Sequence, residues 1–180
     1  MHGAVNQAVE DLIISKYDEA TWLKIKKKSG FTEEMFLTNE PYPDQLTFDL
    51  VLATNAITKL PVDQILIALG EHWVLETGMK KYGALLRSGG QGFEEFIKYL
   101  PKFHGRVMLV YPNIIPPEFD ITVVSKNELI LHYHSKRDGL TKFVYGLILG
   151  ISKMFDHPVE IEIRDEKLKG KNHDTFYINY

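Results

Sequence analysis

The sequence predicts an α+β fold, in which a mostly helical N-terminal part precedes a four-stranded antiparallel sheet with one packed helix. Three observations predict it. Up to about residue 110, apolar residues recur every three or four positions, which is the period of an amphipathic helix. After Pro112 the apolar residues alternate, as they do in half-buried strands. The later elements run strand, strand, helix, strand, strand, an order typical of a helix packed on an antiparallel sheet.

Composition limits the chemistry of this chain. Its 180 residues suit a single domain over 1–180, divided into a helical subdomain over about 1–60 and an α+β part over about 61–180. The absence of cysteine excludes disulfides, a thiol nucleophile and any Cys-ligated metal site. A net charge of -3 argues against a dedicated nucleic-acid binder. The 7 histidines are therefore the first candidates for metal ligands.

Five helices are expected in the first two-thirds of the chain. The first has one apolar face made of Val5, Ala8, Val9, Leu12 and Ile13. The others are expected over 21–28, 44–58, 62–82 and 93–111. The stretch SGGQG at 88–92 is expected to be a loop. It is not a phosphate loop, because no strand precedes it and no Gly-Lys-Ser/Thr follows.

The last third predicts two strand pairs around a helix. The first pair is a hairpin with its turn at SKNE, and the helix is expected over 139–155. The alternating apolar residues of the strands are Phe119, Ile121 and Val123, then Leu129, Leu131 and Tyr133, then Val159, Ile161 and Ile163, and finally Phe176 and Ile178. The longest apolar run, 143–151, is too short to span a bilayer, and no signal peptide is visible. A cytoplasmic location is expected.

His104 is a candidate metal ligand. It shares one stripe of the 93–111 helix with Ile97, Leu100, Val107, Met108 and Tyr111, so its imidazole should face the core. One reading is a core histidine satisfied by a carbonyl or hydroxyl group. The other is an axial ligand to a metal or a haem, since a neutral imidazole on a rigid apolar helix suits that role.

A second candidate site is the run Tyr133-His134-Ser135-Lys136-Arg137. Because strand side chains alternate, Tyr133, Ser135 and Arg137 are expected to share one face along roughly 13 Å. Two hydroxyls and a guanidinium in a line suit the recognition of paired carboxylates. A polar strand face, or an arginine paired with a local aspartate, is the alternative.

Two rival functions come from the same segment. His132 and His134 form an H-x-H pair on one strand face, but no carboxylate or third histidine is spaced to complete a metal site. A metal-dependent enzyme that uses this pair with Asp138 is the first rival. The other rival is a haem-free module that binds an acidic small molecule or peptide at the Tyr133–Arg137 face.

The combination of these motifs points to one family. Phe103-His104, Tyr111-Pro112, Pro116-Pro117 and Tyr133-x-Ser135-x-Arg137-x-Gly139-Leu140, in this order and spacing, resemble the haem nitric oxide/oxygen binding (H-NOX) domain. That family comprises bacterial stand-alone gas sensors and the haem domain of soluble guanylate cyclase. The resemblance covers essentially the whole chain.

The resemblance implies a role for each motif residue. His104 matches the axial ligand of the iron in a non-covalent haem b, and Tyr133, Ser135 and Arg137 match the residues that bind the two propionates. Pro117 matches a proline that presses on the porphyrin and distorts it. Val5, Trp73 and Phe143 match residues that line the distal pocket.

The resemblance also implies a ligand preference. Oxygen-binding members carry a distal tyrosine where this chain has Phe143, and Tyr145 should point elsewhere on the helix. We therefore expect an apolar pocket that binds NO and CO but not O₂. The cysteine-based zinc site of some relatives should be absent. We expect a sensor, not an enzyme, which signals through weakening of the Fe–His bond to a separate protein such as a histidine kinase or a cyclic-di-GMP enzyme.

Overall fold

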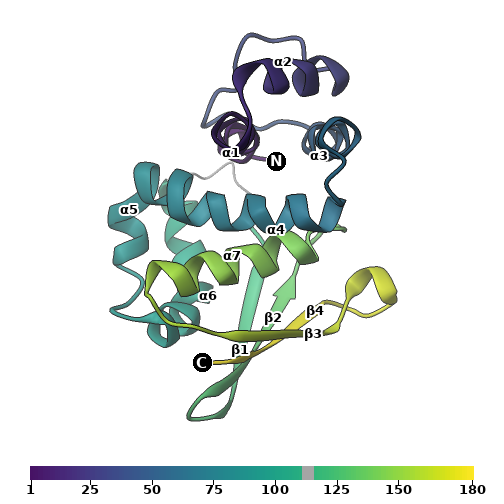
Figure 1. Cartoon of the computed structure of the whole chain (residues 1–180). Helices are drawn as coiled ribbons and strands as arrows, with labels where there is room; N and C mark the ends of the chain where they lie inside the picture. Colours follow the sequence, from purple (N-terminus) through teal and green to yellow (C-terminus); the bar gives the residue numbers. More distant parts are fainter. Residues whose placement is uncertain (111–115) are drawn as a thin grey trace.

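Three helices form the N-terminal layer of the protein (Figure 1). The computed structural model describes residues 1–110 and 116–180, and of Val110 only the backbone. The three helices are α1 (Gly3–Lys16), α2 (Glu19–Lys28) and α3 (Asp44–Thr58). Asp18 begins α2, since its carboxylate accepts the Thr21 N–H at 2.6 Å, and three lysines in the last turn favour the negative end of the helix dipole.

The next helical stretch is interrupted where a single helix over 62–82 was predicted. It consists of α4 (Val62–His72), a π-helix (Trp73–Gly78) and α5 (Met79–Arg87), with non-helical backbone angles at Tyr82. The expectation of one regular helix over 62–82 was therefore wrong. A π-turn inserts a residue without changing the apolar character of the face, so periodicity does not reveal it. The helix α6 (Phe93–Val110) follows the SGGQG loop.

The C-terminal part is the predicted antiparallel sheet, in the order β1-β2-β4-β3. Its strands are β1 (Glu118–Ser125), β2 (Glu128–His134), β3 (Glu160–Asp165) and β4 (Asp174–Asn179). Between the two strand pairs lies α7 (Thr141–Met154), which covers one face of the sheet (Figure 1), and a short 3-10 helix spans Lys167–Lys169. The α+β fold class is confirmed.

Glycines allow α4 and α7 to pack at backbone distance, side by side in Figure 1. A Cβ atom on Gly146 of α7 would lie 2.1 Å from the carbonyl oxygen of Ile67, and one on Gly70 of α4 would lie 2.3 Å from the carbonyl oxygen of Phe143. Both distances are far inside van der Waals contact. This close packing fixes the position of Phe143, on α7, relative to the π-helix that follows α4.

Two main apolar clusters fill the interior. One joins the sheet to α6 and α7, with Leu131, Ile148 and Phe176 almost fully buried. The other joins α1, α2 and α3, with Ile25 and Leu50 fully buried. Trp73 packs against both clusters, so the π-helix lies where the two parts of the core meet.

Within residues 1–110 and 116–180, no helix alone is long and apolar enough to cross a bilayer. Asp44–Thr58 and Val62–Arg87 meet the length and composition criteria only when taken together, as a pair bent by 117°.

Candidate cofactor site

A cavity of about 550 Å³ lies between the helices and the sheet. Its walls are mostly apolar and come from α1, the π-helix, α5, α6, α7 and the first two strands. Seven of the eight residues predicted from the sequence line it: Val5, Trp73, His104, Pro117, Tyr133, Arg137 and Phe143. The structure therefore brings together residues that are more than 130 positions apart in the chain.

His104 lies on α6 and contributes an imidazole to one wall of the cavity. Its Nδ1 is 3.3 Å from the carbonyl oxygen of Leu100, one turn earlier on the helix. A carbonyl only accepts, so this contact requires the proton on Nδ1 and leaves the lone pair on Nε2. Burial lowers the pKa of His104, while the Leu100 hydrogen bond acts against that shift. The ring is thus held as a neutral imidazole, the form that ligates metals.

The rings of Phe103 and Phe119 pack around His104. Their centroids are 5.6 Å and 5.1 Å from that of the imidazole. Farther along α6, the prediction that Met108 faces the core is wrong, because Met108 is 45% exposed. Pro116 and Pro117 line the cavity, whereas Tyr111 and Pro112 of the predicted motif lie outside the described residues.

The Tyr133–Arg137 segment differs from the predicted continuous strand. The strand β2 ends at His134, and Ser135 then turns the chain, because its hydroxyl accepts the backbone N–H of Arg137 at 3.0 Å. Tyr133 points from the strand into the cavity, and Arg137 reaches it from the turn. Burial raises the pKa of the Tyr133 phenol, and a hydrogen bond with Ser135 opposes that shift.

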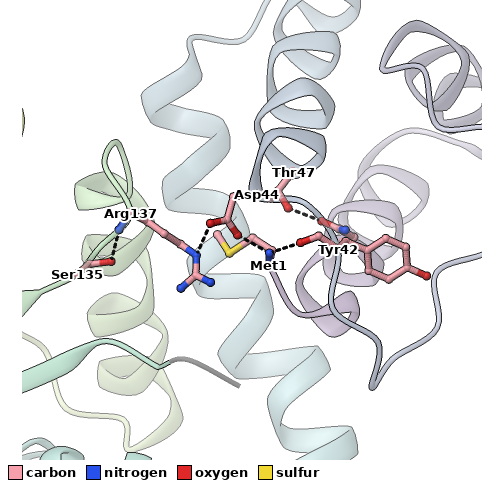
Figure 2. Close-up of polar contacts among 7 residues, drawn as sticks. Met1, Tyr42, Asp44, Thr47, Ser135 and Arg137 are labelled. Carbon is pink, nitrogen blue, oxygen red and sulfur yellow. Dashed lines mark hydrogen bonds and ion pairs between the residues drawn. The ribbon is translucent and has the colours of Figure 1, made fainter. Parts of the chain in front are cut away.

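Asp44 is a site residue that sequence reasoning missed. Its Oδ2 accepts the Nε–H of Arg137 at 2.9 Å, and its other oxygen contacts the Met1 amine (Figure 2). Burial tends to raise the pKa of Asp44, but the hydrogen bonds from Met1 and Arg137 outweigh burial and hold that pKa below its ordinary value. The two partners are 93 positions apart, so no local spacing could have indicated the pair.

The Asp44 contact aligns the guanidinium of Arg137. Asp44 lies in the first turn of α3, and it contacts Arg137 through Nε. Figure 2 shows the guanidinium between the two parts of the chain, with its terminal nitrogens turned away from Asp44. A guanidinium presents its N–H donors in a planar fork, the geometry that suits a carboxylate.

The rest of the cavity wall is apolar and aromatic. Val5, Trp73 and Phe143 line it, whereas Tyr145 packs against the core cluster around α7. Tyr82 also lines the cavity, with its ring stacked on Trp73 at a centroid distance of 6.4 Å. Tyr82 was missed because the helix was expected to be regular, and the irregular backbone at this residue changes the direction of its side chain.

A third histidine, His173, lies beside the H-x-H pair, whereas the predicted Asp138 contacts a lysine. Asp138 forms an ion pair with Lys167 at 2.7 Å. His173, which comes immediately before β4, lies beside the pair, with its Nε2 3.0 Å from Nδ1 of His132. The sequence did not indicate this contact, because it depends on the pairing of β2 with β4.

The chain and its architecture match known haem-binding domains. The family model described as Haem-NO-binding matches residues 2–163. An H-NOX protein from Shewanella oneidensis, solved in the Fe(II)NO ligation state, shares the fold with a TM-score of 0.91 over 99% of this chain and 98% of that chain, at 17% sequence identity. The fold and the site thus define a haem-binding sensor domain.

Curated relatives agree with this class. Soluble guanylate cyclase gcy-31 of Caenorhabditis elegans is 31% identical over 92% of this chain and 24% of its own length. Soluble guanylate cyclase 89Db of Drosophila melanogaster is 26% identical over 86% of this chain and 23% of its own length. The chain spans about a quarter of the length of these relatives. It belongs to the haem-NO-binding (H-NOX) family.

The residues present fit a haem. Haem is a flat, mostly apolar group with an iron at its centre and two carboxylates on one edge. The cavity offers apolar walls, one neutral imidazole, and a phenol and a guanidinium contributed from the same segment of chain. Carboxylates at a half-buried edge require donors and at least one cation, and Tyr133, Ser135 and Arg137 are of those types.

Proposed function

We propose that this chain is a haem-based gas sensor that binds NO and CO, but not O₂, at a ferrous haem b held by His104. One observation carries the proposal. The His104 imidazole is buried, kept neutral by its surroundings, and hydrogen-bonded through Nδ1, which leaves Nε2 for iron in a cavity of about 550 Å³. When bound, haem supplies the ferrous iron that takes the gas.

The chain's own residues would hold and orient that group. Tyr133 and Arg137 would donate to the propionates, and Ser135 would order the turn between them. Pro117 would press against the ring from the wall that carries Phe119. Val5, Trp73 and Phe143 would line the face on which the gas binds, where the absence of a donor on Phe143 favours NO and CO over the more polar O₂ complex.

Signalling would pass through α6. A change in the pull on His104 acts on this helix, and α6 packs against β1. If gas binding weakens the Fe–His bond, the position of α6 that is favoured without gas and the position favoured with gas would differ in free energy. Such a difference is what a shift in a conformational equilibrium requires. The output would go to a separate protein, such as a histidine kinase or a cyclic-di-GMP enzyme. The proposed role is sensing, not catalysis.

The His104→Gly variant tests the ligand assignment. Removing the imidazole should abolish haem retention during purification, and about 10 mM imidazole in the buffer should restore it, because the free base enters the space left by the side chain. Absorption at the Soret band reports the haem content. His157→Gly is the control, since this exposed histidine lies outside the cavity lining. Unchanged haem content and an unchanged spectrum without imidazole would contradict the assignment.

A further inference from the structure

The outer face of the sheet carries a cluster of imidazoles that the haem site does not use. His132 and His134 lie on the side of β2 opposite to the buried residues Leu131 and Tyr133. The β2–β4 register pairs Tyr133 with Asp174, so its next step places His173 across from His134. Three histidines therefore meet on one face.

The distances within this histidine cluster are short. Nδ1 of His132 and Nε2 of His173 are 3.0 Å apart, and the ring of His134 stacks on that of His173 at 4.3 Å. Two ligand nitrogens on one Zn²⁺ ion, each about 2.0–2.1 Å from it, lie only slightly farther apart than 3.0 Å. The two nitrogens share a hydrogen bond, and a metal ion between them would displace the shared proton.

Carboxylates flank the same cluster. Asp120 of β1 lies opposite His132, and its Oδ2 is 3.4 Å from Nε2 of His134. Asp165 of β3 pairs with Thr175, which lies opposite His132. Imidazoles beside carboxylates form a ligand set suited to Zn²⁺.

We propose that His132, His134 and His173 form a binding site for a divalent transition-metal ion of the Zn²⁺ type, separate from the haem cavity. As they stand, the described residues do not present three ligands to one centre, because the His134 ring stacks on His173. Rotation of that ring about its side-chain bonds completes the set. The rotation is open to it, since the His134 side chain is 38% exposed.

Such an ion would brace the edge of the haem site. It would tie the end of β2 to the connection that enters β4, one residue from Tyr133 and one from the buried Asp174. Asp174 accepts hydrogen bonds from Thr141 of α7 and from the backbone of Lys167. The ion would thus fix a point where β2, β4 and α7 meet.

Calorimetric titration of the chelator-treated, haem-loaded protein with ZnCl₂ tests the proposal. One Zn²⁺ per chain is expected, and His132→Ala or His173→Ala should each weaken binding by about tenfold or more. His157→Ala should bind as the parent does, and Mg²⁺, which prefers oxygen ligands, should not bind at this site. Soret absorption and far-UV circular dichroism should be the same in all variants.

Thermal unfolding gives an independent readout. Zn²⁺ should raise the melting temperature of the parent and of His157→Ala, and leave that of His132→Ala/His173→Ala unchanged. If the parent takes up no Zn²⁺, or the double variant binds it as tightly as the parent, the proposal is overturned. Neither outcome depends on gas binding, so failure here leaves the haem proposal intact.

Discussion

At the residue scale, the environment of His104 suits the imidazole to the ligand role that we propose for it. Burial disfavours its charged form, and the Leu100 carbonyl fixes the proton on Nδ1. Both effects act before any iron is present. The imidazole is therefore preorganised for the proposed role by the helix that carries it, which would reduce the free-energy cost of binding.

The oxygen prediction belongs to Phe143. The ferrous parent protein should form no stable oxygen complex in air, because Phe143 offers no hydrogen bond to a polar Fe–O₂ unit. Phe143→Tyr should slow O₂ dissociation by about tenfold, the effect of one hydrogen bond of about 1.4 kcal/mol. Stopped-flow absorption measures the rate, and Phe143→Leu, which also lacks a donor, is the control.

A stable oxygen complex in the parent would contradict that assignment. Tyr82 then becomes the residue to examine, since its phenol also lines the cavity. Loss of the complex in Tyr82→Phe would identify Tyr82 as the donor, whereas persistence of the complex would direct attention to the Trp73 indole.

The propionate prediction compares three substitutions. Arg137→Ala should speed haem transfer to an acceptor apoprotein by about tenfold or more, since a charged hydrogen bond contributes about 1.5–3 kcal/mol. Asp44→Ala should have a smaller effect in the same direction, because it removes only the group that aligns Arg137. Lys136→Ala is the matched control, as this neighbour is exposed. Equal transfer rates for Arg137→Ala and Lys136→Ala would contradict the role of Arg137.

Individual residues differ in how far the sequence could predict them. His104, Tyr133 and Arg137 carry local motifs, and the structure places all three on one cavity. Asp44 and His173 carry none, because their contacts arise from pairing between distant segments. Ser135 was predicted on a strand face, but its hydroxyl accepts the backbone N–H of Arg137 and turns the chain there. Such a side-chain hydrogen bond competes with strand pairing, and the alternation of apolar residues does not reveal it.

At the scale of elements, the seam between α4 and α7 holds the aromatic wall of the cavity. Gly146→Ala should lower the free energy of unfolding by about 2–3 kcal/mol, because the new methyl group meets backbone that cannot move aside. Gly105→Ala, in α6 with open space around its Cβ position, should be neutral or slightly stabilising. Chemical denaturation measures both, and equal stability of the two variants would contradict this account of the seam.

Periodicity predicted the existence of the elements better than their internal geometry. The bounds of α3 and the presence of all four strands match the expectation. The π-helix, which packs against α7 and α1, does not follow from periodicity, and neither does the irregular backbone at Tyr82. Pro101 lies inside α6 on its exposed side, where one missing backbone hydrogen bond is tolerated.

At the scale of the whole molecule, the site depends on both parts of the chain. Arg137 lies in the turn after β2, and Asp44 is the first residue of α3 in the N-terminal layer. Their contact therefore joins the two parts of the chain beside the cavity (Figure 2). The division into a subdomain over about 1–60 and another over about 61–180 stays a prediction.

The most direct test of the central claim is the absorption spectrum of the anaerobic ferrous protein before and after addition of NO. The account predicts a strong Soret band in the purified protein and a shift of that band to shorter wavelength with NO, as expected when the bond between iron and His104 breaks. Under the same conditions His104→Gly carrying imidazole should give the same final spectrum as the parent. A colourless protein, or a Soret band that NO leaves unchanged, would contradict the account.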